Sequence, residues 1–271
     1  MNYLTFSIFY NQNEWFKLLN HLQSFKYLDD IKITFFLRLS YERGPHIQFT
    51  IKVDKSNRRK YALYFSKYIN DFLIKNYSSN KNLETIPHKL FKDFTNNSLH
   101  YGVDDYFNLS KKDQSINYYS QITEIIFLIY EEYQEDAIES LTEIMIQVFA
   151  ISSLASNISI DSLIIIFEQL LKKESAKYNE ESLKNQQKVN SGDFNDNKEL
   201  IVEYLKEILI DKTNTPIQGW EKKVYDLVLS SSIKNIDKQV AIDICENINY
   251  NSNSAHDMFL KSLKELKLFR N

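Results

Sequence analysis

The segment HIQFTIKV (46–53) alternates between polar and apolar side chains along its whole length. A period of two is typical of a strand with one face on a core and the other on water or a ligand. The preceding apolar run, 31–40, and the turn residues Gly44 and Pro45 complete a predicted hairpin. The polar row on the second strand comprises His46, Gln48 and Thr50.

The rest of the N-terminal third mixes strand-like and helical patterns. Residues 2–10 are rich in aromatic and β-branched side chains and predict another strand. Apolar residues recur at helical spacing in 12–25 and in 55–77. The stretch 80–113 is expected to be mostly irregular, with a short apolar piece that begins near Leu99.

Beyond residue 113 the pattern is almost entirely helical. Helices are expected over 114–133, 136–152, 159–173, 198–211, 216–231, 236–249 and 254–269. The polar stretch 185–198 interrupts them and predicts a mobile loop. The order of elements indicates an α+β fold, in which a small antiparallel sheet in the N-terminal third packs with a predominantly helical remainder. We expect a single domain over residues 1–271.

Composition then excludes several classes of function. The 271 residues carry 33 basic and 36 acidic side chains, for a net charge of −3, which argues against a binder of nucleic acid. Only four glycines occur, too few for a glycine-rich phosphate loop. The first residues lack the features of a signal peptide, and no apolar run reaches the roughly 20 residues of a membrane span. A cytoplasmic protein without a membrane partner is therefore expected.

Local motifs of metal binding and nucleophilic catalysis are absent from the sequence. No two of the five histidines stand three or four positions apart, and the single cysteine excludes a cysteine-rich zinc site. Cys245 lies in an apolar helical context, where a buried inert thiol is expected. Arg58, Arg59 and Lys60 form a basic cluster at a helix start, which favours a solvated face over an anion or acidic-peptide contact.

Three sequence blocks, in order, resemble the lantibiotic dehydratase C-terminal family, whose members are also labelled thiopeptide-type bacteriocin biosynthesis proteins. FFLRLSYERGPHIQFTIKV (35–53) is similar to the family hairpin F-(I/L)-R-Y … G-x-H-(L/I)-R-(L/I)-R. LHYGVDDYF (99–107), followed by INYYSQITEIIFLI (116–129), resembles the R-Y-G-G block and the helix after it. SAHDMFLKSL (254–263) resembles the C-terminal S-x-x-H-M-x-x-N-R-L helix.

The resemblance implies one of two chemistries on a ribosomally made precursor peptide, and neither needs a cofactor. Eliminases remove glutamate from glutamylated serine or threonine, which leaves dehydroalanine or dehydrobutyrine. The stand-alone thiopeptide pyridine synthases instead join two dehydroalanines of one peptide by a formal aza-[4+2] cycloaddition. Loss of water and of the leader peptide then leaves a pyridine in a macrocycle.

The eliminase motif is incomplete in this sequence. Its two hairpin arginines fall on Gln48 and Thr50, and the arginine of its R-Y-G-G block falls on His100. Its C-terminal histidine falls on Asp257, or on His256 after a shift of one residue, and both alignments stay open. A guanidinium is the natural bidentate partner of a carboxylate, and Gln or Thr does not replace it. The resemblance therefore favours ring closure on a neutral, azole-rich peptide over removal of glutamate.

The resemblance also implies a set of site residues. The expected catalytic residues are His100, Tyr119 and Asp257. The expected substrate-binding residues are Arg38, His46, Gln48, Thr50, Tyr101, Ser120 and His256. His100 is the best titratable group near neutral pH, and Gln48 and Asp257 can orient an amide. Packing or capping is the alternative role for about half of this set, judged against how aromatic and polar residues are commonly used.

The sequence thus predicts a cofactor-free pyridine synthase of thiopeptide biosynthesis. The alternatives are the separate elimination subunit of a split dehydratase and a non-catalytic leader-binding subunit. An arginine such as Arg38, Arg43 or Arg58 in the pocket would restore elimination. Expected partners are the precursor peptide, with its leader and modified core, and other enzymes of the same pathway; a homodimer stays open. The leader is expected along a sheet or helix surface, where addition to the sheet is the economical mode.

Overall fold

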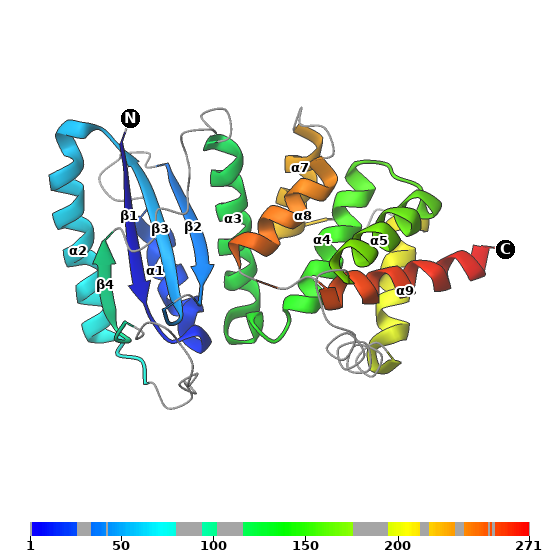
Figure 1. The fold of residues 1–271 in the computed structure, drawn as a ribbon, viewed down its shortest axis with the longest axis horizontal. Coiled ribbons are helices and arrows are strands. Elements are labelled where there is room, and N and C mark those ends of the chain that lie inside the picture. Colours follow the sequence, from blue (N-terminus) through cyan, green and yellow to red (C-terminus); the bar gives the residue numbers. More distant parts are fainter. Residues whose placement is uncertain are drawn as a thin grey trace. The chain divides into compact units, whose positions relative to one another are not determined.

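The computed structural model describes residues 2–25, 34–41, 43–79, 94–101, 116–175, 195–211, 217–230, 236–248, 250 and 253–270. Contacts divide the chain into two compact units (Figure 1). Unit 1 comprises Met1–Ile138 with Glu246–Asn249, and unit 2 comprises Glu139–Cys245 with Tyr250–Asn271. The single domain expected over 1–271 stays a prediction. None of the described helices combines the length and the apolar character that crossing a bilayer requires.

Unit 1 contains a four-stranded antiparallel sheet in the order β2-β3-β1-β4. Its strands are β1 (Asn2–Phe9), β2 (Phe35–Ser40), β3 (His46–Val53) and β4 (Ser98–Tyr101). The predicted hairpin is confirmed as the β2–β3 pair. The short apolar piece near Leu99 proves to be an edge strand paired with β1, which local periodicity did not predict. The small antiparallel sheet and the helices that follow it confirm the α+β class.

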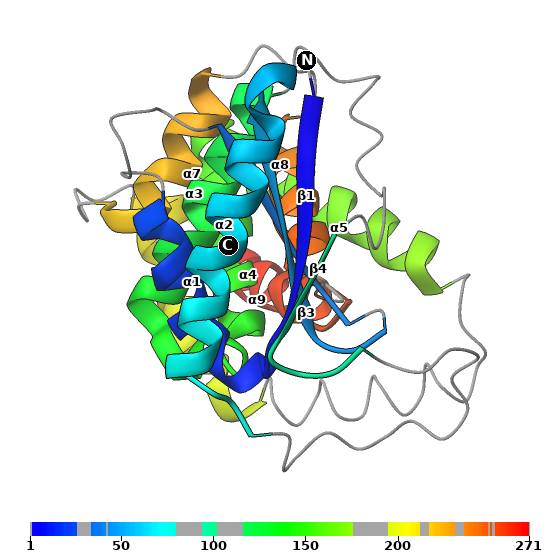
Figure 2. The same cartoon turned by 90° about the vertical axis from the view of Figure 1, so that its left-hand side faces the viewer.

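Two helices cover the apolar face of this sheet, α1 (Trp15–Phe25) and α2 (Arg58–Lys75), as Figure 2 shows. Each follows a short 3-10 turn, Gln12–Glu14 or Lys55–Asn57. Alternation in the strands brings their apolar side chains onto the face that the helices cover. Phe49 of β3 stacks on Phe65 of α2, with ring centroids 5.2 Å apart. This contact lies in a cluster of buried aromatic rings that includes Phe6, Phe25, Phe49 and Phe65.

Helix α3 (Ile116–Tyr133) protects the β2 edge of the sheet. The backbone N–H of Leu37 donates to Thr123 Oγ1 over 3.1 Å, and the Thr123 hydroxyl donates to the Tyr119 carbonyl over 2.9 Å. Phe35 also packs against Phe127, with ring centroids 5.6 Å apart. An exposed strand edge is a template for unwanted pairing, and a covering helix prevents it. A 3-10 turn, Gln134–Ala137, ends this helical segment.

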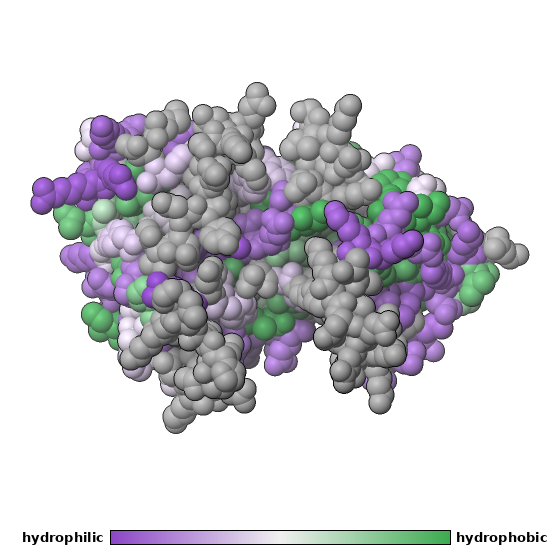
Figure 3. All heavy atoms as spheres, in the orientation of Figure 1, coloured by the Kyte–Doolittle hydropathy of each residue, from purple (hydrophilic) through white to green (hydrophobic). Residues whose placement is uncertain are grey.

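The described regular elements of unit 2 are all helices. Its elements are α4 (Leu141–Ala155), α5 (Ile160–Ser175), a helix over 195–206 that ends in a π-turn (Glu207–Asp211), α7 (Gly219–Ser230), α8 (Ile236–Asn247, whose last residues belong to unit 1) and α9 (Asn253–Arg270). Helix α4 packs on α7 and α9, and α5 packs along α9. On the face drawn in Figure 3, hydrophilic residues cover much of the described surface, with apolar patches between them.

Two boundary predictions were wrong. Helix α4 begins at Leu141 rather than near residue 136, because a 3-10 turn precedes it and Gln134 has a positive φ of 48°. Residues 195–198, expected in a mobile loop over 185–198, belong to a helix, while residues 185–194 lie outside the described residues. In both places polar residues near the helix start concealed the boundary in the sequence pattern.

The aromatic cluster predicts a sharp contrast between two substitutions on α2. Phe65→Ala removes a fully buried ring and is expected to lower the free energy of unfolding by about 3–5 kcal/mol. Leu63→Ala, at a side chain that is 64% exposed, is expected to change it by less than about 0.5 kcal/mol. Urea unfolding followed by Trp15 fluorescence, in a Trp220→Phe background, isolates unit 1. Equal effects of the two substitutions would contradict this core.

Candidate functional site

A polar row crosses all four strands on the sheet face opposite the aromatic cluster. Ser7 of β1 pairs with Gln48 of β3 on one side and with His100 of β4 on the other. Gln48 in turn pairs with Arg38 of β2. Directly paired residues share a face of an antiparallel sheet and lie close together. The register therefore aligns Arg38, Gln48, Ser7 and His100 in one line.

On the same face, the side chains in the two rows next to the polar row form hydrogen bonds or stacking contacts. Thr5 and Thr50 face each other with their hydroxyl oxygens 3.0 Å apart. His46 donates from Nδ1 to the Gly44 carbonyl over 2.9 Å, and its ring stacks on Phe9 with centroids 4.6 Å apart. These contacts give the expected binding residues His46 and Thr50 structural partners within the sheet.

The centre of the polar row has unused hydrogen-bonding capacity. Ser7 is fully buried and Gln48 is 2% exposed. Within the described residues, neither Ser7 Oγ nor Gln48 Oε1 has a hydrogen-bond partner. A buried polar atom without a partner destabilises a fold by about 1–3 kcal/mol. Ser7 Oγ and Gln48 Oε1 therefore mark a place where a bound peptide or ordered water can supply the missing hydrogen-bond partners.

His100, at the end of the row, is held as a neutral imidazole. Burial, and secondarily the charge of Arg43, lower the pKa of His100 below the usual 6.5. The Ser98 hydroxyl donates to the Thr95 carbonyl, so its oxygen accepts from His100 Nε2–H, 3.0 Å away. Nδ1 then carries the lone pair. His100 can thus accept a proton at Nδ1 at neutral pH.

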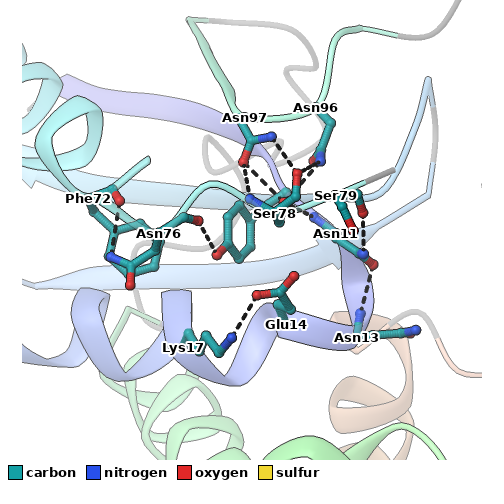
Figure 4. A network of polar contacts seen from close by, with 11 residues as sticks. Asn11, Asn13, Glu14, Lys17, Phe72, Asn76, Ser78, Ser79, Asn96 and Asn97 are labelled. Carbon is teal, nitrogen blue, oxygen red and sulfur yellow. Dashed lines mark hydrogen bonds and ion pairs between the residues drawn. The ribbon is translucent and has the colours of Figure 1, made fainter. Parts of the chain in front are cut away.

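A network of amide and hydroxyl side chains holds the start of β4 (Figure 4). Asn97 Oδ1 accepts from the Ser78 backbone N–H over 2.9 Å and from the Ser78 hydroxyl over 3.0 Å. Asn96 donates to the Ser78 carbonyl over 3.0 Å, and Asn11 donates to the Ser79 carbonyl over 2.9 Å. Since β4 has only four residues, these contacts supplement a short ladder. They fix the strand that carries His100.

Two arginines border the polar face. Arg38 belongs to the row itself, opposite Gln48. Arg43 lies in the hairpin turn with a positive φ of 59°, and its guanidinium carbon stands 4.3 Å from the centroid of the Phe94 ring. Phe94 packs on His100, with centroids 4.2 Å apart. Although Gln48 and Thr50 replace the motif arginines, unit 1 therefore places one guanidinium group in the row and another beside it.

The remaining predicted residues of unit 1 lie elsewhere. Tyr101 is on the opposite face of β4 from His100, where its hydroxyl donates to the Ala62 carbonyl over 3.1 Å and contacts Ser66. Tyr119 is buried in α3 against Tyr118, with ring centroids 5.3 Å apart, and the half-buried Ser120 follows it. Alternation along β4 thus keeps Tyr101 out of the polar row.

His256 and Asp257 belong to α9 in unit 2. His256 is buried beside Phe149 and Phe167, with ring centroids 4.9 and 5.5 Å away. It lines a small cavity of about 30 Å³ with Ser152. Asp257 forms an ion pair with Lys261, one turn further along the helix, over 2.7 Å. That these residues act together with His100 stays a prediction.

Sequence reasoning missed Ser7, although it recognised the strand that contains it. Alternation over 2–9 places Ser7 on a different face from Phe6 and Ile8, which was an available signal. Its pairing with Gln48 and His100 depends on contacts between distant segments and could not be read locally. In the described part of the chain, no three His, Cys, Asp or Glu side chains gather closely enough to hold a metal ion.

The fold is similar to that of a pyridine synthase of known structure. One solved structure with this likeness is the pyridine synthase TbtD from thiomuracin biosynthesis, with a TM-score of 0.65 over 97% of both chains. Sequence identity is 9%, so the likeness concerns the fold alone. No family model matches the sequence, and no curated protein matches it either. The predicted resemblance is confirmed at the level of the fold.

From the surroundings of His100 we predict how its pKa changes when Arg43 is substituted. Arg43→Gln removes a nearby positive charge and is expected to raise the pKa of His100, while burial still keeps that pKa below 6.5. Arg43→Lys keeps the charge and should leave the pKa low. The measurement is an NMR titration of the imidazole carbon-bound protons. Arg58→Gln is the control, and an equal rise there would contradict a local effect of Arg43.

Proposed function

We propose that the protein is a thiopeptide macrocyclase, a pyridine synthase that joins two dehydroalanines of a leader-bearing, azole-containing precursor peptide. The observation that carries this proposal is the buried pair Ser7 and Gln48, next to neutral His100, in a fold similar to that of TbtD. These side chains are uncharged hydrogen-bonding groups, suited to a peptide bond. The expected substrate is correspondingly a neutral peptide.

The first chemical step converts one amide of the substrate into its iminol form. In the proposed mechanism, His100 Nδ1 accepts the amide N–H proton while the Ser7 hydroxyl lies within reach of the carbonyl oxygen that becomes protonated. Gln48 Oε1 accepts from a neighbouring N–H and fixes the peptide plane. The C=C–N=C unit formed in this way is the 2-azadiene that reacts with the second dehydroalanine.

The later steps need little more than positioning and proton transfer. Holding the two alkenes in a near-attack pose can contribute roughly 7–11 kcal/mol in favourable cases. Two new carbon–carbon bonds, between the terminal carbons of the azadiene and the alkene carbons of the second dehydroalanine, close the six-membered ring. Protonated His100 then delivers its proton to the departing hydroxyl, which leaves as water, and the imidazole takes up a ring C–H proton. His100 passes this proton to the leader nitrogen, so that the leader departs as its amide. Loss of a second ring proton to solvent gives the aromatic pyridine. Phe9 and Phe94, which pack on His100, offer aromatic surface beside these reacting groups.

Glutamate elimination is the second candidate, and Arg38 and Arg43 favour it. Elimination requires a base for the α-proton of a glutamylated serine or threonine and a cation for the departing carboxylate. His100 can serve as the base, and a guanidinium is the best partner for a carboxylate. Elimination assigns Arg38 and Arg43 a direct role, whereas under ring closure Arg43 only lowers the pKa of His100.

Mass spectrometry of purified protein with two synthetic peptides separates these functions. One peptide carries a leader, two dehydroalanines and several thiazoles; the other is glutamylated on serine. We expect the first to lose water and its leader amide and the second to remain unchanged. Turnover of the glutamylated peptide alone would overturn the proposal in favour of elimination. Binding without turnover of either peptide would favour the non-catalytic leader-binding subunit.

Substitution of Arg38 gives an independent discrimination. Under ring closure, Arg38→Gln keeps the polar row hydrogen-bonding and should change kcat by less than about tenfold, equivalent to 1.4 kcal/mol. Under elimination, loss of a carboxylate partner should lower kcat by about a hundredfold or more. Arg38→Lys is the matched control for charge. A collapse of cyclisation in Arg38→Gln that Arg38→Lys rescues would contradict a neutral site.

His100 should control both the rate and its pH dependence. His100→Gln is expected to lower kcat by roughly 10²–10⁴-fold, the range typical of a lost general base. His21→Gln, at a histidine of α1 that stacks on Tyr68, is the control and should retain the rate. Because a protonated imidazole cannot accept a proton, activity should fall as the pH drops through the lowered pKa of His100. Wild-type rates in His100→Gln would remove His100 from the mechanism.

A further inference from the structure

A small cavity lies between helices α4, α5, α8 and α9 of unit 2. Its volume is about 30 Å³. Most of the side chains that line it are apolar, with the rings of Phe149 and Phe167 among them. The polar residues of its wall are Ser152, Ser153 and His256. The cavity is therefore apolar for the most part, with a few polar groups from α4 and α9.

Ser152 brings to this cavity a hydroxyl that has no hydrogen-bond partner. The residue is 2% exposed, and within the described residues its Oγ makes no hydrogen bond. Two other buried serines of unit 2 donate to the carbonyl four residues earlier. Ser153 donates to the Phe149 carbonyl over 2.6 Å, and Ser262 donates to the Met258 carbonyl over 2.9 Å. Because buried side-chain polar atoms are nearly always hydrogen-bonded, we expect the partner of Ser152 inside the cavity.

A water molecule matches both the size and the polarity of this cavity. On the same measure of volume, roughly 10–15 Å³ is enough for one water, which needs two to four polar partners. The Ser152 hydroxyl can donate to such a water. The Ser153 hydroxyl gives its hydrogen to the Phe149 carbonyl, so its oxygen can accept from the water. The cavity is much smaller than the about 300–1,000 Å³ of pockets that bind organic ligands.

We propose that the cavity binds an ordered water molecule, which bridges the hydroxyls of Ser152 and Ser153 against the ring of His256. The two hydroxyls suffice as partners, and the imidazole forms a third side of the site. Because the serines belong to α4 and His256 belongs to α9, the water fills the boundary between two packed helices. It thereby helps to hold the first turn of α9 in place. This site does not depend on the proposed cyclisation.

A crystal structure of the full-length protein tests the site directly. We expect a water peak within about 2.5–3.2 Å of both Ser152 Oγ and Ser153 Oγ. Ser152→Val removes the hydroxyl and fills the space with methyl groups, so its crystals should lack this peak. A wild-type cavity without the peak would overturn the proposal. Xenon bound in wild-type crystals under xenon pressure would also overturn it, because dry apolar cavities take up xenon.

The sign of a stability change provides a test in solution. Ser152→Ala should lower the Tm by about 2–4 °C, because the bound water loses a hydrogen-bond partner. A dry cavity predicts the opposite sign, since the substitution would then remove a buried hydroxyl that has no partner. Thermal unfolding followed by Trp220 fluorescence, in a Trp15→Phe background, reports on unit 2. A Tm equal to or above that of the unsubstituted background protein would contradict the bound water.

Ser262→Ala is the matched control for this measurement. Ser262 is also a buried serine in a helix of unit 2, but its hydroxyl has a carbonyl partner and does not line the cavity. The gain in helix propensity from serine to alanine is the same at both positions. Ser262→Ala should therefore change the Tm less than Ser152→Ala. An equal fall in both variants would show that loss of any buried serine hydroxyl has this effect, and the assignment of a water to Ser152 would fail.

Discussion

The two-residue period of the strands is the constraint on which unit 1 depends. The four strands pair in fixed registers, and successive side chains of a strand point to opposite faces. When an apolar side chain faces α1 and α2, the next residue of that strand therefore points to the other face. Burial of Phe49 against Phe65 therefore also fixes where Gln48 points. A slip of one residue would invert both faces at once. The same hydrophobic contacts that stabilise the core thus align the polar groups of the site.

The polar face combines neutral groups at its centre with positive charge at its edge. Ser7 and Gln48 are buried without partners, whereas Arg38 and Arg43 lie at the periphery. The charge of Arg43 adds to the effect of desolvation in lowering the pKa of the half-buried His100. Ring closure requires the site to position a neutral amide, and elimination requires it to stabilise a departing carboxylate. Which of the two the site favours therefore depends on how far these guanidinium groups reach toward a substrate. Both proposed chemistries would use His100 as the base and the same sheet as its support.

Much of the fold could be predicted from local patterns. The β2–β3 hairpin and the boundaries of α3 and α9 followed from periodicity, within a few residues. Strand β4 could not be predicted in this way, because four residues are too few to show a clear alternation and their pairing with β1 is non-local. The site was predictable in part: Gln48 and His100 came from a family resemblance, while Ser7 required the register. The placement of Tyr101 away from His100 required knowing that both lie on a strand.

The mode of attachment of β4 also has a consequence for how the site can change through evolution. His100 is positioned by a short strand, by the Ser78, Asn96 and Asn97 contacts, and by Tyr101, which packs on Phe6 of the aromatic cluster. Substitutions in those polar contacts can shift the imidazole by small amounts while the hydrophobic interior stays intact. Selection can therefore adjust the alignment of the base separately from the stability of the fold, and homologous chains can acquire different reactions on one unchanged scaffold.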